Sequence, residues 1–425
     1  MLIEFRVKNF ATLKDRTILS AEAATRLRKF KKSNVFYHQN PQLLKNLLIL
    51  GPNGSGKTSL LNGLRLMKLL VLHGGTRSVT ENLRYNPFLF DVTSKNKDTE
   101  FGVRISIQNQ IYDYSFKYNS KVVDYEKLSL ITKAGKEKIY FERKNKDFTV
   151  KNEKLESAEG KVRENALFLF TAQENNDEIS SKVYKWFDKD LLIIRSRLEI
   201  PEYLIRLMEN EELKNEMVSF LQCADFNIKD INLRQIAVKT DDFSAHLAKT
   251  LNISIPEKQY ELFTIHTSFK NNKPVGQSEL PLQLESVGTR RIFYIMLTVI
   301  YSQLHGNSKT LLIDEFDNSL HSELASTLIK IFNSEQSQNQ YILTTHNVEL
   351  LDDDIRVDQM LLMGKNAEGI SHLKSIYNIS ASSSQGRHDV SFAKRYIKGQ
   401  FGAVPSINLD QLKTTLDTIH KKFNK

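Results

Sequence analysis

The chain has 425 residues, of which 40% are hydrophobic and 26% charged, a globular composition that excludes collagen-like and low-complexity chains. Its formal net charge of +10 is compatible with a polyanionic partner but does not demonstrate one. The single cysteine, Cys223, excludes an internal disulfide framework and a cysteine-rich zinc site. The longest apolar run, residues 292–301, is too short to span a bilayer, and residues 1–10 lack a secretory signal. We therefore expect a cytoplasmic protein without a membrane segment.

Hydrophobic periodicity predicts an α/β protein in which strands and helices alternate. In chain order we expect strands at 1–10 and 43–50, a helix at 58–71, a block of short strands at 86–150, helices over 178–223 and a strand at 259–269. Further on we expect a helix at 286–304, a strand at 309–313, a helix at 322–332, strands at 341–345 and 358–363, a flexible loop at 380–386 and an amphipathic helix at 408–423.

A glycine-rich segment, GPNGSGKT, separates the second strand from the first helix and matches G-x-x-x-x-G-K-[ST]. Glycines let backbone N–H groups converge on phosphate oxygens, and the helix N-terminus adds its positive end. Lys57 would supply a charge for the β- and γ-phosphates, and Thr58 a hydroxyl for Mg²⁺. A plain glycine turn does not need the Lys-Thr pair, so a nucleotide-binding loop is favoured. The predicted binding residues are Gly51, Asn53, Gly54, Ser55, Gly56, Lys57, Thr58 and Ser59.

Two carboxylates, Asp314 and Glu315, directly follow the apolar run at 309–313. Ligands of open α/β sheets bind outside the carboxyl ends of the strands. Asp314 is expected to hold Mg²⁺, and Glu315 to orient or deprotonate the attacking water. The alternative is an aspartate that only caps a helix, and the phosphate-binding loop makes the catalytic interpretation the stronger one.

A second candidate anion site opens the apolar helix at 286–304. Ser286 is a suitable N-cap, and Gly288 would expose backbone N–H groups to a phosphate. From this segment alone, an ordinary capped helix is the favoured interpretation.

In this order, GPNGSGKT, LESVGTRR, LLIDEF, DNSLH and TTHN resemble the motifs of ABC-type ATPases, closer to the SMC and RecF branch than to transporter subunits. The resemblance implies a Mg²⁺-dependent ATP hydrolase with a P-loop NTPase fold and a two-lobed head. It implies a first lobe at 1–175 with a β-rich insertion at 86–150, a helical subdomain with a return strand at 176–280 and a second lobe at 281–425.

The resemblance also implies roles for residues outside the P-loop. Ser286 and Gly288 would reach the γ-phosphate held by another copy, so that a homodimer or higher homo-oligomer sandwiches ATP. His346 resembles the switch histidine that contacts the γ-phosphate, which would make Lys57, Glu315 and His346 the catalytic set. The segment 317–320 resembles the D-loop at the dimer interface.

Two features of the motifs are less regular. Gln173 resembles the Q-loop glutamine that reaches Mg²⁺, and a solvated loop glutamine is the alternative. Glu285 before the signature serine and Thr-Arg-Arg after the glycine depart from the transporter form LSGGQ. This departure leaves the roles of Thr289 and Arg290 open.

Two further stretches, 112–130 and 394–405, resemble the AAA-domain ATPases of phage-defence and abortive-infection operons, such as those of the RloA and AriA type. This narrower resemblance implies a sensor or regulatory subunit that controls a separate toxic effector, such as a nuclease. The sequence shows no RxxxxH or HNH-like nuclease pattern of its own. A RecF-like DNA-repair ATPase and a non-catalytic ATP-dependent scaffold are the alternatives.

Basic residues cluster at 26–32 and 133–154. They have two interpretations, either solvated loops or contacts with nucleic-acid phosphates. The family resemblance adds a third for residues 26–32, a position beside the bound nucleotide.

Overall fold

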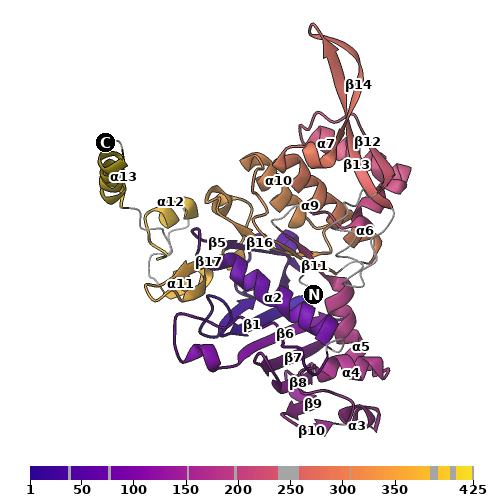
Figure 1. The fold of residues 1–425 in the computed structure, drawn as a ribbon, viewed down its shortest axis with the longest axis vertical. Helices are drawn as coiled ribbons and strands as arrows, with labels where there is room; N and C mark the ends of the chain where they lie inside the picture. The colour runs from indigo at the N-terminus through magenta and orange to yellow at the C-terminus, as the bar shows by residue number, and fades with distance from the viewer. Residues whose placement is uncertain are drawn as a thin grey trace.

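The computed structural model describes residues 1–36, 40–74, 78–150, 153–195, 199–237, 258–306, 308–382, 391–402 and 408–423. Two large sheets form the body, and a long hairpin and a terminal helix project from it (Figure 1). Parts of two predicted segments, residues 383–386 and 403–405, lie outside the described residues.

A six-stranded sheet contains the predicted strands that precede the motifs. Its strands lie in the order β11, β15, β16, β5, β17, β18, and only β17 and β18 pair antiparallel. Their bounds are β5 (Asn46–Leu50), β11 (Leu191–Ile194), β15 (Thr310–Ile313), β16 (Gln340–Thr345), β17 (Met360–Lys365) and β18 (Ser371–Ser375). Parallel strands are covered on both faces, which explains their near-continuous apolar runs.

The two faces of this sheet enter separate cores. The helices that cover it are α2 (Lys57–His73), α9 (Val287–Leu304) and α10 (Ser322–Phe332). Leu47 and Ile49 of β5 pack with α2, whereas Leu48 and Leu50 pack with α9 and α10. The alternation follows from the two-residue period of a strand. The predicted α/β fold class is confirmed.

A seven-stranded antiparallel sheet lies on the α2 side, in the order β10, β9, β8, β7, β6, β1, β2. The strands are β1 (Leu2–Lys8), β2 (Thr17–Ser20), β6 (Thr99–Ile107), β7 (Gln110–Tyr118), β8 (Val123–Ile131), β9 (Glu137–Lys144) and β10 (Asp147–Val150). The strands predicted within 86–150 therefore begin at Thr99. They are continuous with the first strand, because β6 pairs with β1.

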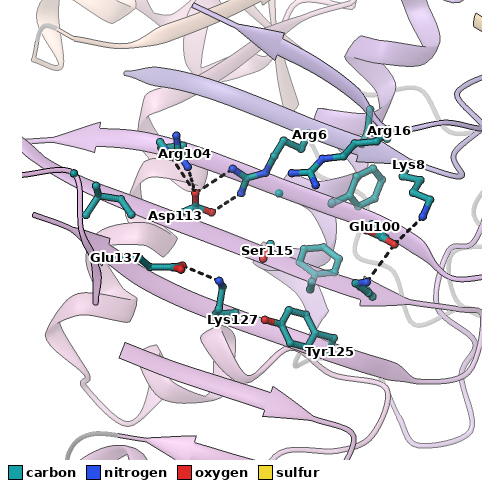
Figure 2. Close-up of a pocket in the computed structure, with 17 residues that line it drawn as sticks. Arg6, Lys8, Arg16, Glu100, Arg104, Asp113, Ser115, Tyr125, Lys127 and Glu137 are labelled. Atoms are coloured by element: carbon teal, nitrogen blue, oxygen red, sulfur yellow. Dashed lines mark hydrogen bonds and ion pairs between the residues drawn. The ribbon is translucent and has the colours of Figure 1, made fainter. Parts of the chain in front are cut away.

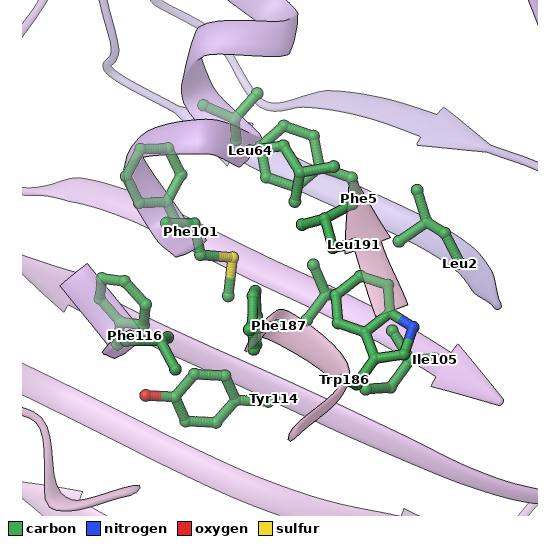
Figure 3. Packing of buried hydrophobic residues seen from close by; sticks show 14 of the residues in the cluster. Leu2, Phe5, Leu64, Phe101, Ile105, Tyr114, Phe116, Trp186, Phe187 and Leu191 are labelled. Atoms are coloured by element: carbon green, nitrogen blue, oxygen red, sulfur yellow. The ribbon is translucent and has the colours of Figure 1, made fainter. Parts of the chain in front are cut away.

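The inner face of this sheet is an aromatic core (Figure 3). Phe5 and Phe101 lie with ring centroids 6.2 Å apart. Leu64 of α2, Trp186 and Phe187 belong to the same buried cluster. The core thus joins the first strand, the P-loop helix and residues more than a hundred positions later.

The outer face carries paired charges (Figure 2). Asp113 accepts hydrogen bonds from Arg6 and forms an ion pair with Arg104 at 2.9 Å. A hollow of about 580 Å³ runs along this face. Gly102 lies beneath Arg6, where a Cβ atom would collide with the guanidinium. Glycine at this position therefore lets the arginine lie flat across the sheet.

Residues 153–223 combine several helices with a strand. They contain α3 (Glu153–Glu159), α4 (Phe168–Glu174), α5 (Glu178–Lys185), the π-helical turn η3 (Trp186–Asp190), α6 (Glu202–Ile205) and α7 (Glu211–Cys223). The prediction of helix throughout 178–223 is wrong at β11, which joins the six-stranded sheet. A four-residue apolar run is too short for its period to distinguish a strand from a helix.

A three-stranded sheet projects from the body (Figure 1). Its strands are β12 (Asp230–Ala237), β13 (Lys258–Lys270) and β14 (Lys273–Pro281). The strand predicted at 259–269 is confirmed as β13, whereas its partners β12 and β14 were not predicted. β14 leads directly into the predicted signature turn.

The remaining α-helices and strands are short, apart from the last helix. They are α1 (Lys31–Asn34), β3 (Val35–Phe36), β4 (Leu43–Leu44), α11 (Ile376–Ser382), α12 (Phe392–Ile397) and α13 (Leu409–Phe423). The helix predicted at 408–423 is confirmed as α13. In the part of the chain that the structure describes, no helix has the length and hydrophobicity needed to cross a membrane.

Candidate active site

The glycine-rich loop joins the carboxyl end of β5 to the start of α2. A Cβ atom on Gly51 would collide with the backbone oxygen of Met363, and one on Gly56 with the Ser371 hydroxyl. Gly54 and Gly56 have φ values of +73° and +108°, in the left-handed region that favours glycine. The loop therefore needs glycine both for its backbone conformation and for its close contacts, and it fits a phosphate cradle.

Lys57 is almost fully buried at the first turn of α2, with 5% of its surface exposed. Its Nζ donates to the carbonyl oxygens of Gly51 (2.6 Å) and Pro52 (3.1 Å), and it lies 3.3 Å from Nδ1 of His346. Burial lowers the pKa of Lys57 to about 8, against the opposing effect of nearby carboxylates, of which Asp314 contributes most. A buried cation at a helix N-terminus is suited to binding phosphate.

Asp314 lies opposite the P-loop threonine. Thr58 Oγ1 is 3.4 Å from Asp314 Oδ1, and the Thr344 hydroxyl donates to the same carboxylate oxygen at 2.7 Å. A hydroxyl and a carboxylate are hard oxygen ligands of the kind Mg²⁺ prefers, so this pair fits a magnesium site. A hollow of about 210 Å³ beside them is lined also by Arg65 and Arg195.

Glu315 has an unusual backbone. Its φ is +51°, a left-handed conformation that costs energy for a residue with a Cβ atom. Its N–H donates to Thr344 Oγ1 at 2.7 Å, and Asn318 donates to its carboxylate at 3.4 Å. Thr344 thus orients both acidic residues, a role that the sequence patterns did not reveal.

Asp317 connects the acidic edge to the strand that carries His346. Its carboxylate accepts a hydrogen bond from the Thr345 hydroxyl at 2.8 Å. Burial raises the pKa of Asp317, and the hydrogen bond from Thr345 opposes that shift. This contact fixes the end of β16, next to His346, against the segment that follows β15.

The predicted signature turn lies in a different part of the surface. Ser286 caps α9 by accepting a hydrogen bond from the Thr289 N–H at 3.0 Å, so the predicted N-cap is confirmed. A Cβ atom on Gly288 would collide with the carbonyl oxygen of Ser319. Ser286, Gly288 and Ser319 line a hollow of about 810 Å³. This hollow shares no lining residue with the smaller one beside Thr58 and Asp314. Within one chain the turn therefore does not meet the phosphate cradle.

The family model for "AAA domain, putative AbiEii toxin, Type IV TA system" matches residues 47–352, more than half of the chain. The chain belongs to this family. The matched segment contains all five motifs, which confirms the resemblance to ABC- and SMC-like ATPases of the AAA-domain type. No curated protein sequence matches the chain.

Solved structures of SMC heads are also similar to this AAA-domain chain. One is the SMC head bound to the C-terminal winged-helix domain of ScpA, with a TM-score of 0.44, 10% identity and coverage of 88% of this chain and 96% of that one. The SMC head of Thermotoga maritima has a TM-score of 0.38 and 11% identity, with 88% and 98% covered. An SMC head bound to ScpA from Pyrococcus furiosus has a TM-score of 0.39 and 11% identity, with 89% and 98% covered.

In this AAA-domain protein, Gln173 does not lie at the carboxyl edge of the six-stranded sheet, where Thr58 and Asp314 meet. α4, which carries it, begins after Leu167, and Leu167 lies against Gly74 at the far end of the 17-residue α2. At 1.5 Å per residue, the start of α4 is therefore about 25 Å from the P-loop, and the seven residues of α4 span only about 10 Å. Gln173 is therefore a poor candidate for a metal ligand. The residue that follows β11 beside Asp314 is Arg195, which the sequence patterns did not identify.

Arg291 links this edge to the signature helix. It is 1% exposed and donates to the backbone oxygen of Arg195 at 3.0 Å. Burial lowers the pKa of Arg291, while the carboxylate of Glu315 has the largest opposing effect. A movement of α9 would therefore displace the backbone of Arg195, which lies beside Asp314.

The departure from the transporter motif at Glu285 has a structural explanation. Its Oε1 accepts a hydrogen bond from the Thr264 hydroxyl at 2.5 Å. The same oxygen lies 2.6 Å from Nε2 of His266. Both partners belong to β13 of the projecting hairpin. Glu285 thereby connects the hairpin to the residue that caps α9.

The basic loop at 26–32 is not beside the cradle. Arg356 donates to the backbone oxygens of Leu27 (3.1 Å) and Lys29 (3.0 Å) and forms a buried ion pair with Asp358. These anchors precede β17, so they lie at the amino edge of the sheet, whereas the P-loop lies at its carboxyl edge. The expectation that this loop lies beside the nucleotide is therefore wrong.

Proposed function

We propose that the chain binds ATP with Mg²⁺ and hydrolyses it at the carboxyl edge of the six-stranded sheet. The observation that carries this proposal is the meeting of distant segments, with Lys57 3.3 Å from His346 and Thr58 3.4 Å from Asp314. A cradle of backbone amides, a lysine and a hydroxyl–carboxylate pair are the parts that phosphoryl transfer uses in P-loop enzymes.

Each of these residues would act through its position. Lys57 would neutralise the β- and γ-phosphates, and Thr58 and Asp314 would hold Mg²⁺. When bound, the metal offsets negative charge on the phosphate oxygens. Glu315 would orient the attacking water and accept its proton, and His346 would donate to a γ-phosphate oxygen.

A second copy would complete the site. Ser286 is exposed at the start of α9, and its hollow is separate from the cradle of its own chain. Leu284 and Val287 beside it are 70% and 44% exposed, an apolar surface suited to burial against another chain. We therefore propose that two copies sandwich two ATP molecules, with Ser286 and Gly288 facing the γ-phosphate of the partner.

The test of catalysis is steady-state ATP turnover of Glu315→Gln. The variant should bind ATP and turn it over at least about 100-fold more slowly, because a general base contributes about that much or more. Glu137→Gln, on the outer sheet face, is the matched control and should turn over normally. A wild-type rate for Glu315→Gln would remove Glu315 from the mechanism.

At the cellular level, we propose that the chain is the sensor or regulatory ATPase of an abortive-infection system that controls a separate toxic effector. The motif resemblance and the description of its family support this role. A second candidate, favoured by the word toxin in that description, is that the chain itself is toxic. Expression of the chain alone distinguishes them, because growth arrest without any other gene supports the second candidate and contradicts the first.

A further inference from the structure

The helix α13 carries an apolar stripe that nothing covers among the described residues. Leu409, Leu412, Leu416 and Ile419 are 58%, 55%, 66% and 49% exposed. Figure 1 shows α13 lying apart from both large sheets. Large apolar side chains gathered on one exposed face indicate an interaction site.

The spacing of the stripe is that of a helix-pairing seam. The four residues follow one another at intervals of three, four and three, which corresponds to positions a, d, a and d of a heptad repeat. Such spacing keeps one narrow line of side chains facing a second helix. It differs from the wider stripe of a helix that lies on the core of its own domain.

One cap and three threonine hydroxyls of α13 have their hydrogen-bond partners within the helix. Asn408 accepts a hydrogen bond from the Gln411 N–H at 3.0 Å and so caps the first turn. The hydroxyls of Thr414, Thr415 and Thr418 donate to backbone oxygens one turn earlier, at 2.7–2.8 Å. A helix of 15 residues is only marginally stable alone. The apolar seam is therefore the part of α13 that gains most from a partner.

The charges beside the seam indicate which partner fits. Lys413, His420 and Lys422 occupy the flanking e and g positions, whereas Asp410 and Asp417 lie at b positions on the far side. A second copy of α13 offers no acidic residue at its own flanks to pair with these groups. A helix with glutamate or aspartate beside its seam offers the opposite charge to Lys413 and Lys422 and a hydrogen-bond acceptor to His420.

We propose that α13 docks an amphipathic helix of a different protein whose apolar seam is flanked by acidic residues. Pairing buries the leucine seam on both sides, and the flanking ion pairs select the acidic partner over a second copy. This inference concerns a surface remote from the P-loop and holds whether or not the chain hydrolyses ATP.

The experiment uses two labelled synthetic helical peptides as probes, both with leucine at a and d. One has glutamate at e and g, the other lysine. Fluorescence anisotropy with the full chain should show binding of the glutamate peptide, weaker by at least about tenfold when salt is raised from 50 to 500 mM. The lysine peptide should not bind in the same concentration range.

Two matched double variants locate the site. Leu412→Ala with Leu416→Ala removes the centre of the seam while keeping good helix formers, and should weaken binding of the glutamate peptide at least about tenfold. Thr414→Ala with Lys421→Ala changes the opposite face and should leave binding unchanged.

Three results would overturn the proposal. The first is failure of the glutamate peptide to bind the full chain. The second is equal binding of the two peptides, which would remove the role of charge. The third is a fall in the molecular mass of the full chain when the seam is replaced, because that would make a second copy the occupant.

Discussion

The carboxyl edge of the six-stranded sheet and the outer face of the seven-stranded sheet are both rich in charge, but they arrange it differently. On the outer face the carboxylates are paired with basic side chains, as in the ion pairs of Arg104 with Asp113 and of Lys127 with Glu137 (Figure 2). At the carboxyl edge, no ion pair joins Lys57, Asp314 or Glu315 to another described residue. Their hydrogen-bond partners are hydroxyls, backbone groups, an imidazole and the Asn318 amide.

This difference separates charges that hold the fold from charges that are kept for a ligand. A paired and nearly buried carboxylate contributes to stability only with its partner, and removal of one member leaves the other desolvated. Unpaired charges and a strained backbone at Glu315 cost stability, and proteins retain such features mainly at functional sites. Substitutions at the carboxyl edge should therefore reduce activity more than stability, and substitutions on the outer face should reduce stability more than activity.

The largest expected effect is on turnover. Asp314→Asn should reduce the rate of ATP hydrolysis on the order of 100-fold and raise the Mg²⁺ concentration needed for half-maximal rate, because one anionic ligand is lost. The same change on the outer face, Asp113→Asn, should leave the Mg²⁺ requirement unchanged. Steady-state assays over a Mg²⁺ titration measure both. Equal changes in turnover and Mg²⁺ requirement for the two substitutions would show that the two regions do not differ in function.

The reciprocal effect is on stability. Asp113 and Arg6 are 9% and 12% exposed, so Asp113→Ala should lower the free energy of unfolding by about 3 kcal/mol, because a nearly buried arginine loses both contacts with Asp113 and keeps its ion pair with Glu4 alone. Asp314→Ala should change it by less than about 1 kcal/mol, because the hydrogen-bond partners of Asp314 are hydroxyls and no ion pair between described residues is broken. Urea unfolding without nucleotide measures both values. A larger decrease in the free energy of unfolding for Asp314→Ala than for Asp113→Ala would show that Asp314 mainly stabilises the fold.

A smaller effect should depend on pH. The pKa of Lys57 falls to about 8 in the fold from 10.5, so the unfolded chain holds that proton more tightly. The charged lysine therefore costs stability below pH 8, and this cost decreases as the pH rises from 8 towards 10.5. Lys57→Met should stabilise the nucleotide-free protein by about 1 kcal/mol at pH 7, less than the full shift because solvent screens part of it.

Unfolding measured at pH 7 and pH 10 tests this sign. The advantage of Lys57→Met should shrink markedly at the higher pH. Lys189→Met, at an exposed lysine, serves as the control and should show no such gain. An advantage that grows with pH would show that the charged form of Lys57 is stabilised by its surroundings.

The smallest expected effect concerns the connection between the hairpin and the signature turn. Glu285→Gln weakens the contacts with Thr264 and His266 while keeping the size of the side chain. We expect a decrease in turnover of roughly fivefold, or about 1 kcal/mol, with little change in nucleotide affinity. Glu261→Gln, elsewhere on β13, is the matched control. An unchanged rate of ATP turnover for Glu285→Gln would show that the contact between the hairpin and the signature turn does not affect catalysis.

The sequence was sufficient where chemistry depends on residues that are close together in the chain. The P-loop needs glycines and a Lys-Thr pair within eight positions, and Asp314 with Glu315 must follow a strand. Hydrophobic periodicity indicated the α/β class, and these short patterns identified most of the residues that meet at the carboxyl edge of the six-stranded sheet. Ser286 was likewise recognisable as a cap from its place before an apolar helix.

The remaining features depend on pairings that are distant in the sequence. β11 has only four residues, so its register beside β15 could not be inferred, and Arg195 at its end was missed with it. The role of Thr344 requires β16 to lie beside β15, and that of His266 requires β13 to pass the signature turn. Gln173 was assigned from a local likeness, and its position at the far end of α2 could only come from the fold.

The central claim, that ATP closes two copies across the cradle and the signature turn, is tested most directly by light scattering. The molecular mass of Glu315→Gln should double on addition of Mg-ATP. Adding Ser286→Asp keeps an N-cap but places a negative charge where the phosphate would lie, so it should prevent the doubling, whereas Ser286→Thr should permit it. A mass that is the same with and without Mg-ATP in all three proteins would contradict the account.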